Sequence, residues 1–404
     1  MIMEDEHLKE KFLKDKYNSI IFEEGGDRKI YLVGGYVRDM LLGVDSSDRD
    51  YIVSGNIKSF VNEIKNITGG TIVEFKRGNM VRLAFKEGIT LDFSKPQGTL
   101  EEDLSKRDFT VNAIAWSPVN GIIDIHNGID DIKKKTIKAI SKENFVSDPL
   151  RMLRAYRFAA EIQGSIEQET RQYIKLLHNK INEVTTERIT LEIFHLLNSE
   201  CSEKYLKLAL DDGILTSIIS FPHRVLEDNI RGIIKLERYL LKDIPQNIKV
   251  ILNKIFSQNI TYKGLLCLEI LLKDCFLMNK QKMKIKISTN MQKRLELTSE
   301  GMLNINKTLK AGSRQLFDLF MKTKEASLDL SIIKNRLDLL KEYKRFQKIW
   351  KNGLMNSNEI IQILNLKPGP EIGKIVTELK RAHFIGRVKS KKQALKFIEG
   401  FICN

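Results

Sequence analysis

Two groups of residues near the N-terminus have the types and spacing needed to handle phosphate. Gly34 and Gly35 follow the apolar run Ile30–Val33 and precede a segment with a helical pattern. Glycines between a strand and a helix let backbone N–H groups approach a phosphate, which the helix dipole also attracts. Asp48 and Asp50 open the next apolar run, so on a strand both carboxylates would lie on one face. Paired carboxylates hold hard cations such as Mg²⁺, and together these features predict nucleotidyl transfer.

Each feature also has a simpler interpretation. A Gly-Gly pair before a helix is often only a turn, and an Asp-x-Asp sequence is often a solvated loop. Arg38, which could meet a triphosphate, could instead form an ion pair with the adjacent Asp39 or with another carboxylate of the same domain. The order and closeness of the features favour a site over chance.

The elements that would position these residues follow from the hydrophobic pattern, which predicts an α+β protein. Residues 28–140 alternate short apolar runs with polar helical segments, as in a small mixed sheet. From Asp148 onward the periodicity is helical almost throughout, and Leu328–Ile349 is one expected helix. In the first part we expect a helix at Ile57–Ile67, a hairpin turn at residues 77–79, and strands at Ile30–Val33, Tyr51–Ser54, Thr71–Phe75, Met80–Phe85 and Thr90–Phe93.

Four ordered motifs resemble those of the class II tRNA nucleotidyltransferase and poly(A) polymerase family. That family comprises tRNA CCA-adding enzymes, their CC-adding and A-adding relatives, and bacterial poly(A) polymerases. The matches cover roughly residues 28–200. The motifs are Gly34-Gly35 with Arg38-Asp39 and Asp48-Arg49-Asp50, Lys106-Arg107-Asp108 with Asn112, the run Asp148 to Phe158, and the run Glu187 to Glu192.

The resemblance implies a division of labour along the chain. Residues 1–140 would form a catalytic nucleotidyltransferase head with a mixed sheet. Residues 141–200 would form a helical neck that selects the nucleotide. Residues 201–404 would form an all-helical body and tail that bind tRNA.

The resemblance also assigns roles in the head. Asp48 and Asp50 would be the catalytic metal ligands, in a two-metal site for Mg²⁺. Gly35, through its backbone N–H, and the guanidinium groups of Arg38 and Arg107 would bind the triphosphate. Supporting roles would fall to Gly34, Asp108 and Asn112.

The neck carries the residues that would read the base. Asp148 and Arg151 lie three residues apart, so they share a helix face. The carboxylate could accept from the exocyclic amine of cytosine or adenine, and the guanidinium could donate to the adjacent ring nitrogen. Arg154 and Arg157 continue the stripe and could bind phosphate or orient the selector. A second role for Asp148 is as the cap of a helix that begins with Pro149.

Two departures from the family pattern bear on specificity. Ser147 stands where the family often has Glu before the selector Asp. The link between the strand Thr90–Phe93 and Lys106 is short and contains Pro96, whereas CCA-adding enzymes have a longer flexible loop there. In this family a shortened loop is typical of CC-adding enzymes, because the loop is thought to act as a lever that reorients the selector from C to A.

We therefore expect a CC-adding enzyme that uses CTP, with a separate A-adding enzyme as a possible partner in sequence. The alternatives are a complete CCA-adding enzyme that also uses ATP, a bacterial poly(A) polymerase, or a catalytically silent RNA-binding protein. No His-Asp dipeptide occurs in the chain. A fused phosphohydrolase domain with its usual metal signature is therefore not expected.

Charge is distributed unevenly between the two halves. Residues 1–200 carry 29 Lys and Arg against 32 Asp and Glu, whereas residues 201–404 carry 38 against 20. A positive excess confined to the half without catalytic motifs predicts RNA binding there, with a solvated lysine-rich surface as the alternative. Within it the segment 366–392 offers the candidate RNA-binding residues Lys374, Lys380, Arg381 and Arg387.

The remaining composition excludes several classes. No apolar run is long enough for a membrane span, and residues 1–16 lack the apolar core of a signal peptide. The four cysteines, Cys201, Cys267, Cys275 and Cys403, have neither disulfide nor metal spacing. These observations predict a cytoplasmic protein.

Overall fold

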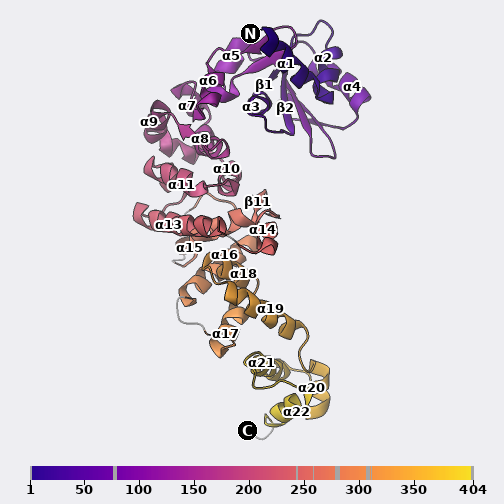
Figure 1. Ribbon diagram of the computed structural model, residues 1–404, viewed down its shortest axis with the longest axis vertical. Coiled ribbons are helices and arrows are strands. Elements are labelled where there is room, and N and C mark those ends of the chain that lie inside the picture. The colour runs from indigo at the N-terminus through magenta and orange to yellow at the C-terminus, as the bar shows by residue number, and fades with distance from the viewer. Residues whose placement is uncertain are drawn as a thin grey trace. The chain divides into compact units, whose positions relative to one another are not determined.

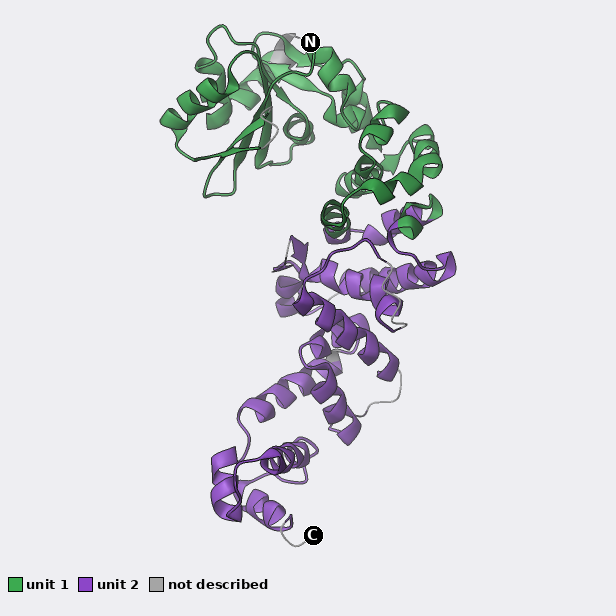
Figure 2. Cartoon of the chain, turned by 180° about the vertical axis from the view of Figure 1, so that it is seen from behind, with its two compact units in different colours: residues 1–196, 211–217 green, residues 197–210, 218–404 purple. Residues whose placement is uncertain are grey.

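The computed structural model describes residues 2–75, 80–242, 244–257, 259–277, 283–305, 310 and 312–401. The expected hairpin turn at residues 77–79 and Cys403 lie outside these residues. The chain divides into two compact units (Figure 2). Unit 1 comprises residues 1–196 and 211–217, and unit 2 comprises residues 197–210 and 218–404.

Unit 1 is built on a seven-stranded mixed sheet of order β3-β4-β5-β2-β1-β6-β7. Neighbouring strands are antiparallel except β2 and β5, which are parallel. The pairing of β2 with β5 brings residues about forty positions apart in sequence side by side at the middle of the sheet. The strands are β1 (Ile30–Val33), β2 (Asp48–Val53), β3 (Thr71–Glu74), β4 (Met80–Ala84), β5 (Thr90–Ser94), β6 (Ala115–Ser117) and β7 (Gly121–Ile123).

The helix α4 (Ile57–Thr68) illustrates how helices attach to this sheet. Its buried residues Ile57, Phe60, Val61 and Ile64 recur at helical spacing, and Asn56 caps its first turn. Phe60 packs edge-on against Phe93 of β5. The other helices of the head are α1 (Ile2–Leu13), α2 (Lys16–Glu23), α3 (Gly35–Leu42), α5 (Leu100–Ser105) and α6 (Gly128–Lys133).

The rest of unit 1 is mostly helical (Figure 1). One short parallel pair, β8 (Thr136–Ile137) with β9 (Ser165–Ile166), is an exception. Within unit 1, α8 carries the run of arginines predicted to select the nucleotide. The helices are α7 (Lys142–Ser147), α8 (Leu150–Glu161), α9 (Gln168–Leu177), α10 (Thr186–Asn198), which ends in unit 2, and α12 (Ile214–Ile218).

Unit 2 is a helical assembly around α15 (Tyr262–Leu277), which is buried on nearly all faces. It also contains the short pair β10 (Ile255–Ser257) and β11 (Ile260–Thr261). The other helices are α11 (Ser202–Asp211), α13 (His223–Leu240), α14 (Gln246–Leu252), α16 (Thr289–Asn304), α17 (Arg314–Thr323), α18 (Ala326–Ile333), α19 (Leu337–Lys351), α20 (Ser357–Leu364), α21 (Pro370–Phe384) and α22 (Lys391–Glu399).

The expected fold class is confirmed: a mixed-sheet N-terminal part precedes a mostly helical remainder. The structure differs from the sequence prediction in two respects. The expected helix Leu328–Ile349 is wrong, because Asn335 adopts a left-handed φ of 52° and separates α18 from α19. The remainder, expected to be all helical, also contains β9, which pairs with β8 of residues 1–140, and the strand pair β10–β11. Among the described residues, no helix is both long and apolar enough to cross a membrane.

Candidate active site

The turn between β1 and α3 requires its first glycine. Gly34 has a φ of 78° and a ψ of −139°, a region that residues with a side chain avoid. A Cβ at Gly34 would lie 2.7 Å from Arg107 Nη1 and 3.3 Å from Asp50 Oδ2. Gly34 is thus the point at which the backbone passes between a guanidinium group and a carboxylate. Gly35 begins α3, where a Cβ would make only an ordinary contact of 3.7 Å with Arg38 Nη2.

The paired aspartates lie on one face of β2, as their spacing predicted. Asp48 is exposed, and its Oδ1 accepts a hydrogen bond from Thr90 Oγ1 at 2.7 Å. Asp50 lies beside Val33 in the register of β1 with β2, directly before the glycine turn. Burial, reinforced by the nearby carboxylates of Asp92 and Asp48, raises the pKa of Asp50 to about 6, and Arg107 opposes this shift.

A third carboxylate, which the sequence did not reveal as part of the site, lies next to this pair. Asp92 on β5 is the register partner of Asp50 and therefore faces the same side of the sheet. Arg82 donates to both of its oxygens, each at 2.6 Å. The only signal in the sequence is the alternation of Leu91, Asp92 and Phe93 in a strand, which places a polar residue between two buried ones.

A cavity of about 250 Å³ lies beside Gly35, Asp48 and Asp50. The cavity brings together most of the predicted head residues and one residue of the arginine stripe. Asp148, Arg151 and Arg157 are not among the residues that line it. The lining comprises Gly35, Tyr36, Arg38, Asp39, Ser46, Asp48, Asp50, Arg107, Asp108, Asn112, Arg154 and Phe158.

The two arginines predicted to meet a triphosphate differ in their bonding. Arg38 is 8% exposed, donates to Asp39 Oδ1 at 2.9 and 2.7 Å, and donates from Nη1 to Asn112 Oδ1 at 2.6 Å. The ion pair with Asp39, one of the interpretations of Arg38, is therefore present. Arg107 has a buried Nε without a hydrogen-bond partner in the described structure. Its ion pair with Asp103 spans 3.6 Å, so Arg107 retains donor capacity beside the cavity.

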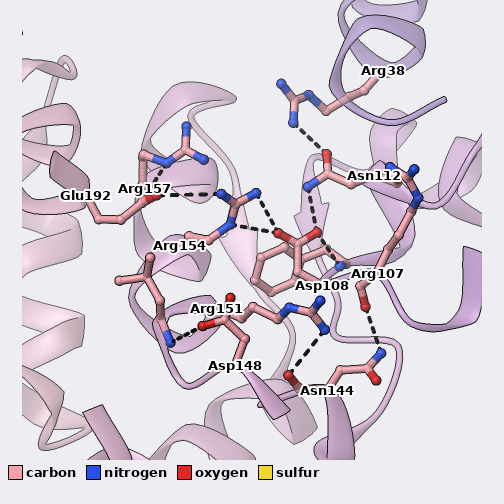
Figure 3. Close-up of polar contacts among 12 residues, drawn as sticks. Arg38, Arg107, Asp108, Asn112, Asn144, Asp148, Arg151, Arg154, Arg157 and Glu192 are labelled. Carbon is pink, nitrogen blue, oxygen red and sulfur yellow. Dashed lines mark hydrogen bonds and ion pairs between the residues drawn. The ribbon is translucent and has the colours of Figure 1, made fainter. Parts of the chain in front are cut away.

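A chain of polar contacts joins α8 and α10 to the head (Figure 3). Arg154 lies at its centre: its Nε donates to Asp108 Oδ2 at 2.9 Å, and its Nη1 lies 3.6 Å from Glu192 Oε1. Asn112 Nδ2 donates to Asp108 Oδ1 at 2.9 Å. Burial favours a raised pKa for Asp108, yet Arg154 and the hydrogen bond from Asn112 bring that pKa below its ordinary value. The ionised carboxylate of Asp108 therefore connects α8, through Arg154, to the N-terminal part of unit 1.

Arg157, at the end of the arginine stripe, does not line the cavity. Arg157 forms an ion pair with Glu192 Oε2 at 2.6 Å (Figure 3). It forms a second ion pair, with Glu161 Oε1, at 2.8 Å. Glu192 thus holds two arginines of α8 from α10. The sequence motif that contains Glu192 was recognised, but no role followed from it, because the pairing of α8 with α10 is a tertiary contact.

The predicted base-reading residues flank the start of α8. Asp148 Oδ1 accepts from the backbone N–H of Leu150 at 3.3 Å, which is a capping contact, although the helix itself begins at Leu150. Its Oδ2 accepts from Arg188 Nη2 at 2.8 Å. Arg151 donates to the carbonyl oxygen of Asn144 at 3.3 Å (Figure 3). The two groups lie within reach of solvent, and Arg188 is a further contributor that sequence reasoning missed.

The candidate RNA-binding residues of unit 2 fall into two pairs. Lys374 and Arg387 are exposed. Lys380 donates to the carbonyl oxygen of Trp350 at 2.6 Å and lies 4.4 Å from the centre of that indole ring. Arg381 forms ion pairs with Asp318, at 2.8 Å, and with Glu378. Only the first pair has a cationic group that is free of such contacts in the described structure.

The donor set fits a magnesium ion. No described cluster of three or more His, Cys, Asp or Glu side chains is arranged to enclose a metal by itself. Mg²⁺ is commonly held by one or two carboxylates together with substrate phosphates, and Asp48 and Asp50 supply two. Asp92 is already paired with Arg82. A cation between Asp48 and Asp50 would favour the charged form of Asp50, whose pKa is raised chiefly by burial and further by the carboxylates of Asp92 and Asp48.

The paired aspartates and the glycine turn of this mixed sheet fit nucleotidyl transfer, and the comparisons with known proteins point to the same class of enzyme. The chain matches the Poly A polymerase head domain over residues 30–96 and 82–138. Residues 165–224 match the model described as the probable RNA and SrmB-binding site of polymerase A.

Individual relatives agree with these matches. A CC-adding tRNA nucleotidyltransferase of Synechocystis sp. is 29% identical over 91% of this chain and 92% of its own. A CCA-adding enzyme of Levilactobacillus brevis is 26% identical over 97% of this chain and 98% of its own. The Thermotoga maritima CCA-adding enzyme, solved with tRNA, shares the fold with a TM-score of 0.75, at 19% identity and 98% coverage of both chains. The family models and these relatives agree on the tRNA nucleotidyltransferase and poly(A) polymerase family.

Proposed function

We propose that this chain is a tRNA nucleotidyltransferase that adds cytidines, from CTP, to the 3′ end of tRNA and stops after two. The likeness to a CC-adding enzyme over about nine-tenths of both chains supports the reaction class and the RNA substrate. The reaction joins the 3′-oxygen of the RNA to the α-phosphorus of the nucleotide and releases pyrophosphate. We place this chemistry in the cavity beside Asp48 and Asp50.

The proposed roles in the head follow from the contacts of each group. Asp48 and Asp50 would hold two Mg²⁺ ions together with the triphosphate. When bound, the metal lowers the pKa of the attacking hydroxyl and stabilises the leaving pyrophosphate. Arg107, with its unpartnered Nε, and the backbone of Gly35 bind phosphate oxygens. Arg38 lines the same cavity, and Asn112 and Asp39 fix the direction of its guanidinium group.

The proposed reading of the base uses Asp148 and Arg151. A carboxylate has about four lone-pair sites, so Asp148 can accept from a base amine while it keeps its bonds to Arg188 and to the backbone. Uracil and guanine present a carbonyl in place of the amine, which would leave the carboxylate unpaired.

The observation that carries the restriction to CC is the short, fixed link after β5. Only residues 95–99 separate the strand from α5. Thr99 and Glu102 form a capping box, and the backbone N–H of Gln97 donates to Asp103 Oδ1 at 3.2 Å. Lys106 Nζ donates to the carbonyl oxygen of Gln97 at 2.8 Å. A short link that is tied to α5 and to Lys106 is poorly suited to be the lever that would reorient the selector from cytosine to adenine.

The test offers purified protein three tRNA transcripts, which end at the discriminator base, after one C and after two Cs. Each is incubated with every nucleotide separately and with CTP plus ATP. We expect addition to stop at two Cs and no AMP to be added to the third transcript. Completion to CCA would contradict the lever argument and leave the nucleotidyltransferase assignment intact.

The second candidate is a complete CCA-adding enzyme, which is favoured by the full-length likeness to the Levilactobacillus brevis enzyme. The same three transcripts separate it from the first. A poly(A) polymerase would instead lengthen generic RNA with ATP, and a silent RNA-binding protein would bind the transcripts without extending them. If the chain adds only CC, a separate A-adding enzyme must finish its product.

A further inference from the structure

One side chain that does not line the candidate active site contacts a proposed metal ligand directly. Thr90 of β5 is the register partner of Asp48 in the parallel pairing of β5 with β2, so both side chains lie on the same face of the sheet. Thr90 Oγ1 donates to Asp48 Oδ1 at 2.7 Å. Because Thr90 is not among the residues that line the cavity, it can act on the site through the carboxylate of Asp48.

The two proposed metal ligands are held in different ways. Asp50 is partly buried, whereas Asp48 is exposed. Among the described residues, the side chain of Asp48 accepts no hydrogen bond besides the one from Thr90, so its Oδ2 is open. The last torsion of an aspartate has a broad range, and fixing it when a cation binds costs rotamer entropy. A hydrogen bond that fixes the carboxylate beforehand reduces this cost.

Thr90 is itself well placed to give a fixed direction to its hydroxyl. Its backbone N–H donates at 3.0 Å to the carbonyl oxygen of Ser47, the residue directly before Asp48. On its other side, Thr90 pairs with Ala84 of β4. Threonine is also branched at Cβ, which restricts its first side-chain torsion. One residue therefore holds both the carboxylate of Asp48 and the backbone that leads to it.

We infer that Thr90 is a positioning residue for the metal site: its hydroxyl holds Oδ1 of Asp48 and leaves Oδ2 free for a divalent cation. Groups that hydrogen-bond to the ligands of a metal orient those ligands and strengthen binding of the ion. The inference rests on the proposed function, because it takes Asp48 and Asp50 as the ligands.

The first test measures cation binding without turnover. Mn²⁺ is the probe in place of Mg²⁺, because the electron paramagnetic resonance signal of the free ion is lost on binding. Thr90→Val removes the hydroxyl but keeps the branched shape, and valine favours strands, so the sheet should persist. We expect the Kd for Mn²⁺ to rise about tenfold. Thr90→Ser keeps the hydroxyl and should retain most of the wild-type affinity.

Thr71→Val is the matched control. Thr71 of β3 lies in the same row across the sheet as Ala84, Thr90 and Asp48, so its side chain is on the same face. Thr71 is exposed, and it lies two strands from Thr90, or about 10 Å. The same chemical change at this position should leave the Kd for Mn²⁺ unchanged.

Incorporation of labelled CMP gives a second readout. Thr90→Val should raise the Mg²⁺ concentration that gives half of the maximal rate by about tenfold. Excess Mg²⁺ should restore that rate, and KM for tRNA should stay unchanged, because no group proposed to bind RNA is altered. A loss of rate that excess Mg²⁺ does not restore would show a general distortion of the head and overturn the inference.

The binding results separate the inference from the proposed function. Asp48→Asn with Asp50→Asn is the reference for loss of the site. If this variant binds Mn²⁺ as tightly as the wild type, the proposed metal site has failed, and the role of Thr90 with it. If the reference loses binding while Thr90→Val keeps it, only the role of Thr90 is rejected. An equal loss in Thr90→Ser and Thr90→Val would also reject that role, because the hydroxyl would not be responsible.

Discussion

Unit 1 and unit 2 each contain a network of charged side chains, and the two differ in what they leave unsatisfied. In unit 2, Arg294 donates to both oxygens of Asp329, at 2.7 and 2.9 Å, and to the hydroxyl of Tyr262 at 2.9 Å. The side chain of Asp329 is fully buried. Burial, followed by repulsion from Asp329, raises the pKa of Glu269 well above its ordinary value, so this carboxyl holds a proton. The network joins α15, α16 and α18.

The network of unit 1 uses similar residues but ends at a cavity. Asp108 is buried, like the residues of the unit 2 network. In contrast, Nε of Arg107 has no hydrogen-bond partner among the described residues, and Asp48 is exposed. A cluster of charged side chains therefore does not by itself indicate a functional site. Donors without partners and an exposed carboxylate around a cavity do indicate one, because their unfavourable free energy is relieved when a ligand binds.

The strongest test of the comparison removes the open carboxylates. Asp48→Asn with Asp50→Asn should reduce nucleotide incorporation by about 10⁴-fold or more, equivalent to about 5.5 kcal/mol of barrier. The fold should persist, because neither carboxylate is an anchor of the unit 1 network. Incorporation of labelled CMP is measured, together with the stabilisation of the protein by Mg²⁺ on heating. Asp45→Asn, which changes an exposed carboxylate three residues away, is the control. Retained activity in the double variant would reject the assignment.

Substitutions in the Arg294–Asp329 network of unit 2 should change the stability of the protein rather than its catalytic activity. Arg294→Met removes the cation and leaves Asp329 buried without its partner, so the free energy of unfolding should fall by about 3 kcal/mol or more. Lys322→Met is the matched control, because its ammonium group pairs with Glu300 at 2.9 Å on the surface. The control should cost less than about 1 kcal/mol. Urea unfolding checks both, and equal costs would show that the unit 2 network is not structural.

The sequence predicted the elements of the head where the pattern was local. Ile30–Val33 is a strand as predicted, and the other four expected strands differ from β2 to β5 only at their ends. β6 and β7 were missed because three residues each give too little alternation to recognise. The break at Asn335 was missed because a left-handed residue inside an apolar helical pattern leaves only a weak signal.

The site could be anticipated only as far as spacing along the chain allowed. The spacing of Asp48 and Asp50 predicted a shared face, because both lie on one strand. Asp92 and Arg188 could not be placed, since strand pairing and helix packing bring them to the site from distant segments. The same limit applies to Arg38, because its bond to Asn112 joins residues 74 positions apart.

A third prediction concerns Gly34, where the backbone passes between Arg107 and Asp50. Gly34→Ala should lower kcat/KM by about thirtyfold, or about 2 kcal/mol, because the new Cβ would displace Arg107 and strain a positive φ. Gly43→Ala is the control. Gly43 also has a positive φ, of 73°, but a Cβ there would meet nothing within 4 Å. If both variants lose the same activity, strain alone is responsible and the close approach to Arg107 is irrelevant.

The smallest expected effect comes from the carboxyl pair of Glu203 and Glu237 in unit 2. This pair is intermediate between the Arg294–Asp329 network and the site of unit 1. Burial and a hydrogen bond with Glu237 raise the pKa of Glu203 to about 7. Lys263 Nζ forms an ion pair with Glu237 Oε1 at 2.5 Å, and burial, opposed by bonds to Glu203 and Lys263, leaves the pKa of Glu237 below its ordinary value. Glu203 is therefore the member that keeps the proton, next to a cavity of about 550 Å³.

The proton on Glu203 makes stability depend on pH with a definite sign. Between the ordinary glutamate pKa and about 7 the folded state binds more protons than the unfolded state, so stability falls as pH rises through this range. Glu203→Gln removes that dependence. Between about pH 5 and pH 8, the stability of wild type relative to this variant should fall by about 1 kcal/mol, after solvent screening is discounted. Urea unfolding at both pH values measures it, with Glu371→Gln, an exposed position, as the control. A difference that stays constant or rises with pH would show that Glu203 is ionised in the folded protein.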